Sequence, residues 1–174
     1  SAQHQVNSIH RFNFFEIIKS LHGCDLLISG GGSLLQDVTS MRSLLYYLSI
    51  LALGVILKKK VMLFGQGIGP INSRFLRKLT KLICSHADLI TVRDQDSLYE
   101  LRRLGVPTQK VQLTADSVLT LPQEGKDLGK GLLNAFHVPA DKMLIAISVR
   151  KWQEDDSYLL ELAKAADLLA EEYN

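Results

Sequence analysis

Neither sign of charge is in excess in this sequence, because 20 lysine and arginine residues face 18 aspartate and glutamate residues and leave a net charge of +2. Such a balance argues against nucleic acid as a partner. The five histidines show no ligand spacing, so we expect no metal site. Cysteine is scarce, and Cys24 and Cys84 stand far apart outside any CxxC pattern. We therefore predict two buried free thiols in a reducing compartment.

The sequence also lacks a hydrophobic run that is long enough to cross a membrane. The segment Leu44–Leu57 is uncharged but only 14 residues long, whereas a membrane-spanning helix needs about 20. We interpret it as part of a buried helix over Met41–Lys58 that is apolar nearly all round, and contact with a membrane surface is the alternative. No signal peptide is visible at the start, so a cytoplasmic location is expected.

Several sequence fingerprints are absent. The runs Gly30-Gly31-Gly32-Ser33 and Gly65–Pro70 do not follow G-x-G-x-x-G, and no G-x-x-x-x-G-K-[ST] occurs. Both nucleotide-binding fingerprints are therefore missing. No G-x-S-x-G sequence occurs either, which argues against a serine hydrolase triad.

What is present is a regular alternation of apolar runs and helical patterns, in a chain of 174 residues that is 47% apolar. That size and composition are typical of a globular domain with a real core. The expected strands are Leu26–Ser29, Val61–Phe64, Leu89–Val92 and Val111–Thr114. Helical patterns precede or separate them, with Asn13, Ser73 and Asp94 as expected N-caps. The pattern predicts an α/β fold, a Rossmann-like parallel sheet with helices on both faces.

The composition changes after residue 121. Residues 1–121 are expected to form one Rossmann-like domain, and residues 122–131 hold three glycines and four charged residues, which is typical of a linker. Residues 132–174 contain an expected strand at Met143–Val149 and a helix near Ser157–Tyr173. This piece either joins the first sheet or opens a second domain. We expect it to dock on the sheet edge or to be exchanged between two chains as a homodimer.

Candidate binding residues follow the ends of the predicted strands. Gly30, Gly31, Gly32 and Ser33 follow the first strand, and Gln66 follows the second. In parallel α/β sheets this edge is where ligands bind. The glycine-rich backbone can form a nest for phosphate or carboxylate, and two tight turns are the alternative.

Charged side chains follow the later strands. Arg93 either forms a salt bridge with a neighbouring aspartate or clamps an anionic substrate, since a guanidinium matches carboxylate and phosphate in a fork. Arg150 stands in the same position after the last predicted strand. Asp37 and Asp116 are candidate carboxylates, with helix capping or turn bracing as the alternative for each.

Four segments in series resemble the polysaccharide pyruvyl transferase family. They are Ser29–Asp37, Gly65–Pro70, Thr91–Asp94 and Ala115–Ser117, and their order and spacing agree from about Cys24 to Leu121. The branch they resemble most is the CsaB type, which pyruvylates a secondary cell-wall polysaccharide that anchors S-layer proteins. The run Ile145–Trp152 resembles the first strand of the family's second domain.

The resemblance implies a glycosyltransferase-B-like fold of two Rossmann-like domains with the site between them. It implies phosphoenolpyruvate as donor, a lipid-linked sugar as acceptor, a pyruvate ketal as product and no metal or cofactor. It implies a cytoplasmic enzyme with contact to the inner face of the membrane. Arg93 matches a donor-binding arginine, and Arg93 and Asp116 are the expected catalytic residues. Gly30–Ser33, Gln66 and Arg150 are expected to bind substrate.

The sequence departs from the family at both ends. The family's N-terminal strand with its Gly-Asp-Glu loop and most of the second domain have no counterpart, so we expect an inactive fragment that binds donor weakly. Two other interpretations remain open. One is a nucleotide-sugar glycosyltransferase of the same architecture, and the other is a non-enzymatic flavodoxin-like binding module.

Overall fold

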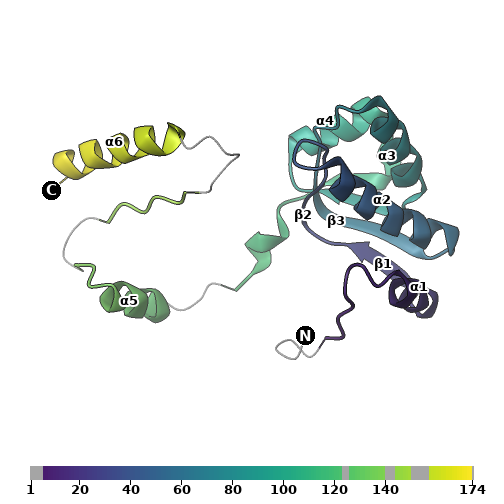
Figure 1. Cartoon of the computed structure of the whole chain (residues 1–174), viewed down its shortest axis with the longest axis horizontal. Helices are drawn as coiled ribbons and strands as arrows, with labels where there is room; N and C mark the ends of the chain where they lie inside the picture. The colour runs from purple at the N-terminus through teal and green to yellow at the C-terminus, as the bar shows by residue number, and fades with distance from the viewer. Residues whose placement is uncertain (1–5, 123–125, 140–143, 150–156, 174) are drawn as a thin grey trace. The chain divides into compact units, whose positions relative to one another are not determined.

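The computed structural model describes residues 6–122, 126–139, 144–149 and 157–173 (Figure 1). The chain folds as two compact units, Ser1–Leu121 and Pro122–Asn174. The first unit holds a five-stranded sheet in which every pair is parallel. Its strands are β1 Leu26–Ser29, β2 Gly32–Leu35, β3 Lys60–Ile68, β4 Leu89–Val92 and β5 Val111–Leu113. The predicted parallel α/β sheet is confirmed.

The helices of this unit begin at the caps that the sequence indicates. They are α1 Phe14–Gly23, α2 Met41–Ile56, α3 Arg74–His86 and α4 Gln95–Leu104. Asn13, Ser73 and Asp94 each accept the backbone N–H three residues ahead, and Ser40 does so for α2. Such a side-chain acceptor satisfies one of the free N–H groups at a helix start. Gly105 ends α4 in the left-handed region, with φ of 79°, a conformation that costs glycine little.

Helices were expected on both faces of the sheet, but α2, α3 and α4 lie on the same face. The strand order β1-β3-β4-β5 runs in one direction, and right-handed connections then place all three helices on the same side. The core between them and the sheet is apolar, and its most enclosed members are Leu44, Leu48, Leu63, Leu76 and Ile90. The expectation that α2 is buried on several sides is wrong, since its fully buried residues form one stripe and Ile56 is 71% exposed.

The first glycine run lies within a strand rather than in a strand-to-helix loop. Ser29 pairs with Leu63 in β1, and Gly32 pairs with Gln66 in β2, so the register is the same on both sides of the break. β1 and β2 are therefore one strand interrupted at residues 30–31. The second run is also internal, because β3 continues through it to Ile68. Gly65, with φ of 57°, lies at a bulge where β3 gains a residue against β4.

The second unit contains two helices in its described part. They are α5 Lys126–Ala135, which begins inside the segment with linker composition, and α6 Ser157–Glu172, close to its predicted span. The strand expected over Met143–Val149 is not formed in the described residues 144–149, which are irregular and exposed. An apolar run becomes a strand only when a neighbour accepts and donates its backbone hydrogen bonds. Among the described residues no helix is both long and apolar enough to cross a bilayer.

Candidate functional site

Arg93 is the centre of the candidate site. It directly follows β4, and its backbone N–H donates to the carbonyl of Gln66, 3.2 Å away. Its Nη1 donates to Oδ2 of Asp116 at 2.8 Å, and its Nη2 donates to Oγ of Ser33 at 2.7 Å. Nε lies 3.5 Å from a carboxylate oxygen of Asp94. The guanidinium thus joins β2, β4 and the segment after β5, while its side chain stays 29% exposed.

Gly67 makes the contact between Ser33 and Arg93 geometrically possible. A Cβ atom at this position would lie 2.7 Å from Oγ of Ser33 and 3.1 Å from Nη2 of Arg93. Both distances are shorter than ordinary contacts between nonbonded atoms. The glycine in β3 is therefore required for the two side chains to meet above the sheet.

Asp116 holds Arg93 and also begins a short 3-10 helix. It lies after β5 and caps η3 Ser117–Thr120 by accepting the N–H of Val118 at 3.1 Å. That hydrogen bond, followed by the contact with Arg93, holds the pKa of Asp116 below its usual value. The carboxylate is therefore ionised at neutral pH. Of the two interpretations of Asp116, a functional carboxylate and a residue that caps or braces a turn, the cap is present.

Asp94 is the second carboxylate beside Arg93. Partial burial favours its neutral form, but hydrogen bonds from Ser97 and the charge of Arg93 outweigh burial, so the pKa of Asp94 is lowered. Its side chain accepts the N–H of Ser97 at 2.8 Å as the cap of α4. The expected salt bridge of Arg93 is present, yet its shorter ion pair is with Asp116.

Gln66 holds the backbone of the interrupted strand instead of facing a pocket. Its Nε2 donates to the carbonyls of Ser29 and Gly30, each at 3.0 Å. The side chain is fully buried, and its Oε1 has no hydrogen-bond partner in the described part of the chain. The amide therefore fixes the break between β1 and β2, which in turn places Ser33.

Gly31 and Gly65 pack against the fourth motif segment. A Cβ on Gly31 would lie 3.4 Å from Oγ of Ser117, and Gly65 also faces Ser117, whereas Gly30 has nothing within 4 Å. The four segments that were singled out in the sequence thus meet at one place. Arg150 lies outside the described residues.

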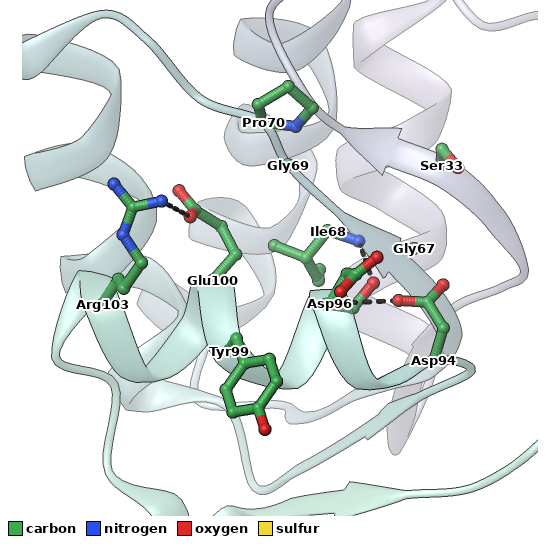
Figure 2. Close-up of a pocket in the computed structure, with 11 residues that line it drawn as sticks. Ser33, Gly67, Ile68, Gly69, Pro70, Asp94, Asp96, Tyr99, Glu100 and Arg103 are labelled. Carbon is green, nitrogen blue, oxygen red and sulfur yellow. Dashed lines mark hydrogen bonds and ion pairs between the residues drawn. The ribbon is translucent and has the colours of Figure 1, made fainter.

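Beside this cluster is a pocket of about 440 Å³ at the end of β3 and the start of α4 (Figure 2). Its lining is Ser33, Gly67, Ile68, Gly69, Pro70, Asp94, Asp96, Ser97, Tyr99, Glu100 and Arg103. Glu100 is largely buried and pairs with Arg77 and Arg103, the latter at 3.4 Å. The lining carries three carboxylates and one guanidinium, and of the carboxylates Glu100 and Asp94 are paired with arginines. Such a pocket suits hydroxyl groups better than an anion.

Sequence reasoning missed the α4 wall of this pocket. Asp96, Glu100 and Arg103 follow one another at helical spacing, which places them on one side of α4. That spacing, together with the N-cap at Asp94, would have allowed this wall of the pocket to be predicted from the sequence.

The structure also shows the role of Asp37 and allows a search for metal-binding clusters. Asp37 does not cap α2; its carboxylate accepts the N–H of Asn72 and of Ser73, both at 2.8 Å, and so braces the start of α3. No three histidine, cysteine or acidic residues gather as a metal site within the described ranges.

Comparison with known proteins gives a family match. Residues 3–173 match the family model described as "Polysaccharide pyruvyl transferase". A curated relative, the amylovoran biosynthesis protein AmsJ of Erwinia amylovora, is 28% identical over 136 residues. The alignment covers 78% of this chain and 32% of the relative, so the chain spans about a third of the length of the curated relative it matches. No solved structure matches the chain significantly.

Proposed function

The chain belongs to the polysaccharide pyruvyl transferase family, and from this premise we propose that its protein transfers a pyruvyl group from phosphoenolpyruvate to a sugar of a lipid-linked cell-wall polysaccharide precursor. The observation that carries the proposal is the convergence of Ser33, Arg93 and Asp116, which come from three separate motif segments. The product is a pyruvate ketal. The full enzyme has two Rossmann-like domains of the glycosyltransferase-B type, and this chain supplies one wall of the site.

Arg93 is proposed to bind the anionic donor. A guanidinium has five N–H groups, and the contacts with Ser33, Asp94 and Asp116 engage three of them in the described part of the chain. One N–H on each terminal nitrogen is left for the carboxylate or phosphate of phosphoenolpyruvate. Charge grows on the phosphate as it leaves, and a fixed cation stabilises that charge most. The glycine backbone at residues 30–32 is the proposed second contact for the donor.

Asp116 is proposed to orient Arg93 rather than to deliver a proton. Ketal formation needs a base for the sugar hydroxyls and an acid for the methylene carbon of the donor. The lowered pKa of Asp116, caused by the Val118 N–H and then by Arg93, keeps it ionised. It is therefore unsuited as the acid.

The acidic pocket beside the cluster is proposed to hold the acceptor sugar. Its carboxylates, together with Tyr99, offer acceptors and a donor for hydroxyl groups. Because Ser33 and Gly67 belong both to the cluster and to the pocket lining, the two substrates would meet there.

We also propose that two copies of the chain exchange their C-terminal segments and so form a homodimer. Light scattering, which measures the mass of the particle in solution, tests this.

The test uses the full-length protein with phosphoenolpyruvate and a lipid-linked saccharide. We expect acceptor-dependent phosphate release and a ketal product detected by mass spectrometry. Arg93→Met should lower kcat/KM on the order of 10²- to 10³-fold, as loss of one fixed charge donor does. Arg102→Met removes an exposed arginine of α4 outside the cluster and is the matched control.

Two outcomes would reject the proposal. The first is an Arg93→Met enzyme with the activity of the Arg102→Met control. The second is a melting temperature raised by a nucleotide diphosphate but unaffected by phosphoenolpyruvate, which would favour a nucleotide-sugar glycosyltransferase. Stabilisation by neither ligand, without turnover, would favour a non-enzymatic module.

A further inference from the structure

One stretch of the sequence is free of acidic residues. No aspartate or glutamate occurs between Asp37 and Asp88, and the stretch carries eight lysines and arginines: Arg42, Lys58, Lys59, Lys60, Arg74, Arg77, Lys78 and Lys81. The whole chain has a net charge of only +2. The positive charge is therefore concentrated on α2, β3 and α3, and the rest of the chain is acidic on balance.

The outer surface of α2 and α3, here called the α2–α3 face, combines these cations with exposed apolar side chains. The two helices pack side by side (Figure 1). Their buried stripes face the sheet, so their exposed residues face away from it. The exposed lysine, arginine and large apolar residues on these helices are Met41, Arg42, Leu45, Ile56, Arg74, Phe75, Lys78, Lys81 and Leu82, and the exposed Lys58 follows the end of α2.

On α3 the outward stripe consists only of basic and apolar residues. Arg74, Phe75, Lys78, Lys81 and Leu82 have the spacing of one helical face. Phe75 is 67% exposed and Leu82 is 59% exposed. None of the ion pairs found among the described residues involves the three cations of this stripe, although Nζ of Lys81 lies beside Gly105 at the end of α4. A strip of exposed cations around two exposed apolar side chains is complementary to a surface that is both anionic and apolar.

We propose that the α2–α3 face docks on an anionic phospholipid bilayer. Helices that lie in the membrane interface are rich in lysine and arginine and place phenylalanine and leucine among them. Each cation near an anionic surface adds to binding, and the apolar side chains enter the acyl boundary. The absence of acids across the described α2 and α3 removes the repulsion that such a surface would otherwise meet.

The location of this face fits an acceptor carried by a lipid, and to that extent the inference rests on the proposed function. Pro70 lines the pocket of Figure 2, and α3 begins at Arg74 shortly after it. Arg77 on α3 pairs with Glu100, which also lines the pocket. The helix α3, which belongs to the proposed docking surface, is therefore adjacent to the pocket. A sugar on a membrane-bound lipid would reach the pocket over the first turn of α3.

The experiment is cosedimentation of the 174-residue chain with lipid vesicles. One set contains phosphatidylglycerol mixed with phosphatidylcholine, and the other contains phosphatidylcholine alone. We expect binding to the anionic set at low salt, and weaker binding at high salt because exposed charges are screened. The double variant Lys78→Gln and Lys81→Gln should bind at least about tenfold more weakly, since each cation near the surface contributes about 1 kcal/mol.

The matched control removes the same charge from the second unit, by Lys130→Gln with Lys164→Gln. Both lysines are exposed on α5 and α6, and this variant should bind as the unchanged chain does. Phe75→Ser tests the apolar part and should weaken the binding that remains at high salt. Circular dichroism checks that each variant is folded.

Three results would overturn the assignment. They are absence of binding to anionic vesicles, equal loss of binding in the control variant, and self-association through these residues without lipid, which would assign the face to a second copy of the chain. Failure of docking is separable from failure of the proposed function. Transfer to a soluble acceptor by the full-length protein, without vesicle binding, would reject only the docking surface. Vesicle binding by the 174-residue chain together with absence of transfer by the full-length protein would reject only the proposed function.

Discussion

At the scale of single residues, a substitution of Gly67 changes the geometry of the candidate site without changing its charge. A Cβ at Gly67 would press on Oγ of Ser33 and on the guanidinium of Arg93, which are the ends of flexible side chains. We expect Gly67→Ala to cost only about 1 kcal/mol of folding stability, the low end for overpacking. It should nevertheless lower kcat/KM at least tenfold by parting Ser33 from Arg93. Chemical denaturation and steady-state kinetics of the full-length protein measure the two effects.

Gly23→Ala is the control for that substitution. Gly23 ends α1, and a Cβ there would have nothing within 4 Å. This variant should keep both stability and activity. Equal activities of the two variants would show that the contact between Ser33 and Arg93 is not needed for turnover.

The two cysteines differ in accessibility. Cys84 is fully buried, and desolvation raises the pKa of its thiol to about 12, whereas Cys24 is only partly buried. In the native chain we expect a thiol reagent to label Cys24 first and Cys84 only after denaturation. Sequence analysis predicted free thiols for both, which holds, but full burial for both, which holds only for Cys84.

The same thiol makes stability depend on alkaline pH. A thiol has a pKa of about 8.5 in an unfolded chain, so between that value and about 12 the unfolded state loses the proton while the folded state keeps it. Stability is therefore full below the lower value and falls as pH rises toward the upper one. The unfolding free energy of Cys84→Ala should fall less over this window. A parallel decline in both proteins would contradict the burial of the thiol.

Sequence position predicted that Arg93 and Asp116 lie near each other, because residues that follow parallel strands reach a common edge. Ser33 meets them as well, but from within β2. Sequence position did not find the direction of the Gln66 side chain. Gln66 lies inside β3, and its amide donates to the backbone of the neighbouring interrupted strand. Such a contact is set by strand register, and the register depends on the pairing of Gly32 with Gln66, which local sequence does not specify.

At the scale of elements, Gly54 sets how closely α2 packs on the sheet. A Cβ there would lie 2.7 Å from Cδ2 of Leu27 and 3.1 Å from Cγ2 of Val61. Alanine favours a helix over glycine by about 1 kcal/mol, but the overpacking it causes costs about 1–3 kcal/mol. We expect Gly54→Ala to destabilise the chain on balance, as measured by urea unfolding.

Gly129→Ala is the control for Gly54→Ala, and its expected effect on stability has the opposite sign. Gly129 lies inside α5, where a Cβ would have nothing within 4 Å. Gly129→Ala should therefore only raise helix propensity and increase the helical signal in circular dichroism. A stabilising Gly54→Ala would mean that α2 is not seated closely on β1 and β3.

Element type was predictable where periodicity and caps agreed, as in α3 and α4. It was not predictable for β2, since Gly32 and Ser33 have low strand propensity and form a strand only because β3 offers the matching register. The reverse happened at residues 144–149, where an apolar run has the composition of a strand but no partner in the described part of the chain. Strand formation is decided by neighbours, which a single sequence does not show.

At the scale of the whole molecule, the charge around Arg93 limits what this chain can do alone. One guanidinium stands between the carboxylates of Asp94 and Asp116, and the adjoining pocket is acidic as well. Phosphoenolpyruvate carries a phosphate and a carboxylate, so its binding requires an excess of positive charge. The described residues around Arg93 do not supply that excess. For the proposed donor, further cations from elsewhere in the protein would be needed, and Arg150 is one candidate in this chain.

We therefore expect the 174-residue chain to show no pyruvyl transfer and no change of melting temperature with millimolar phosphoenolpyruvate. The full-length protein should be stabilised, by about 2.7 kcal/mol when the ligand is at 100 times its Kd. Differential scanning fluorimetry compares the two, with inorganic phosphate as the control for unspecific anion effects. A clear upward shift for the short chain that Arg93→Met abolishes would mean that one guanidinium, held by Ser33 and Asp116, suffices for the donor despite its acidic surroundings.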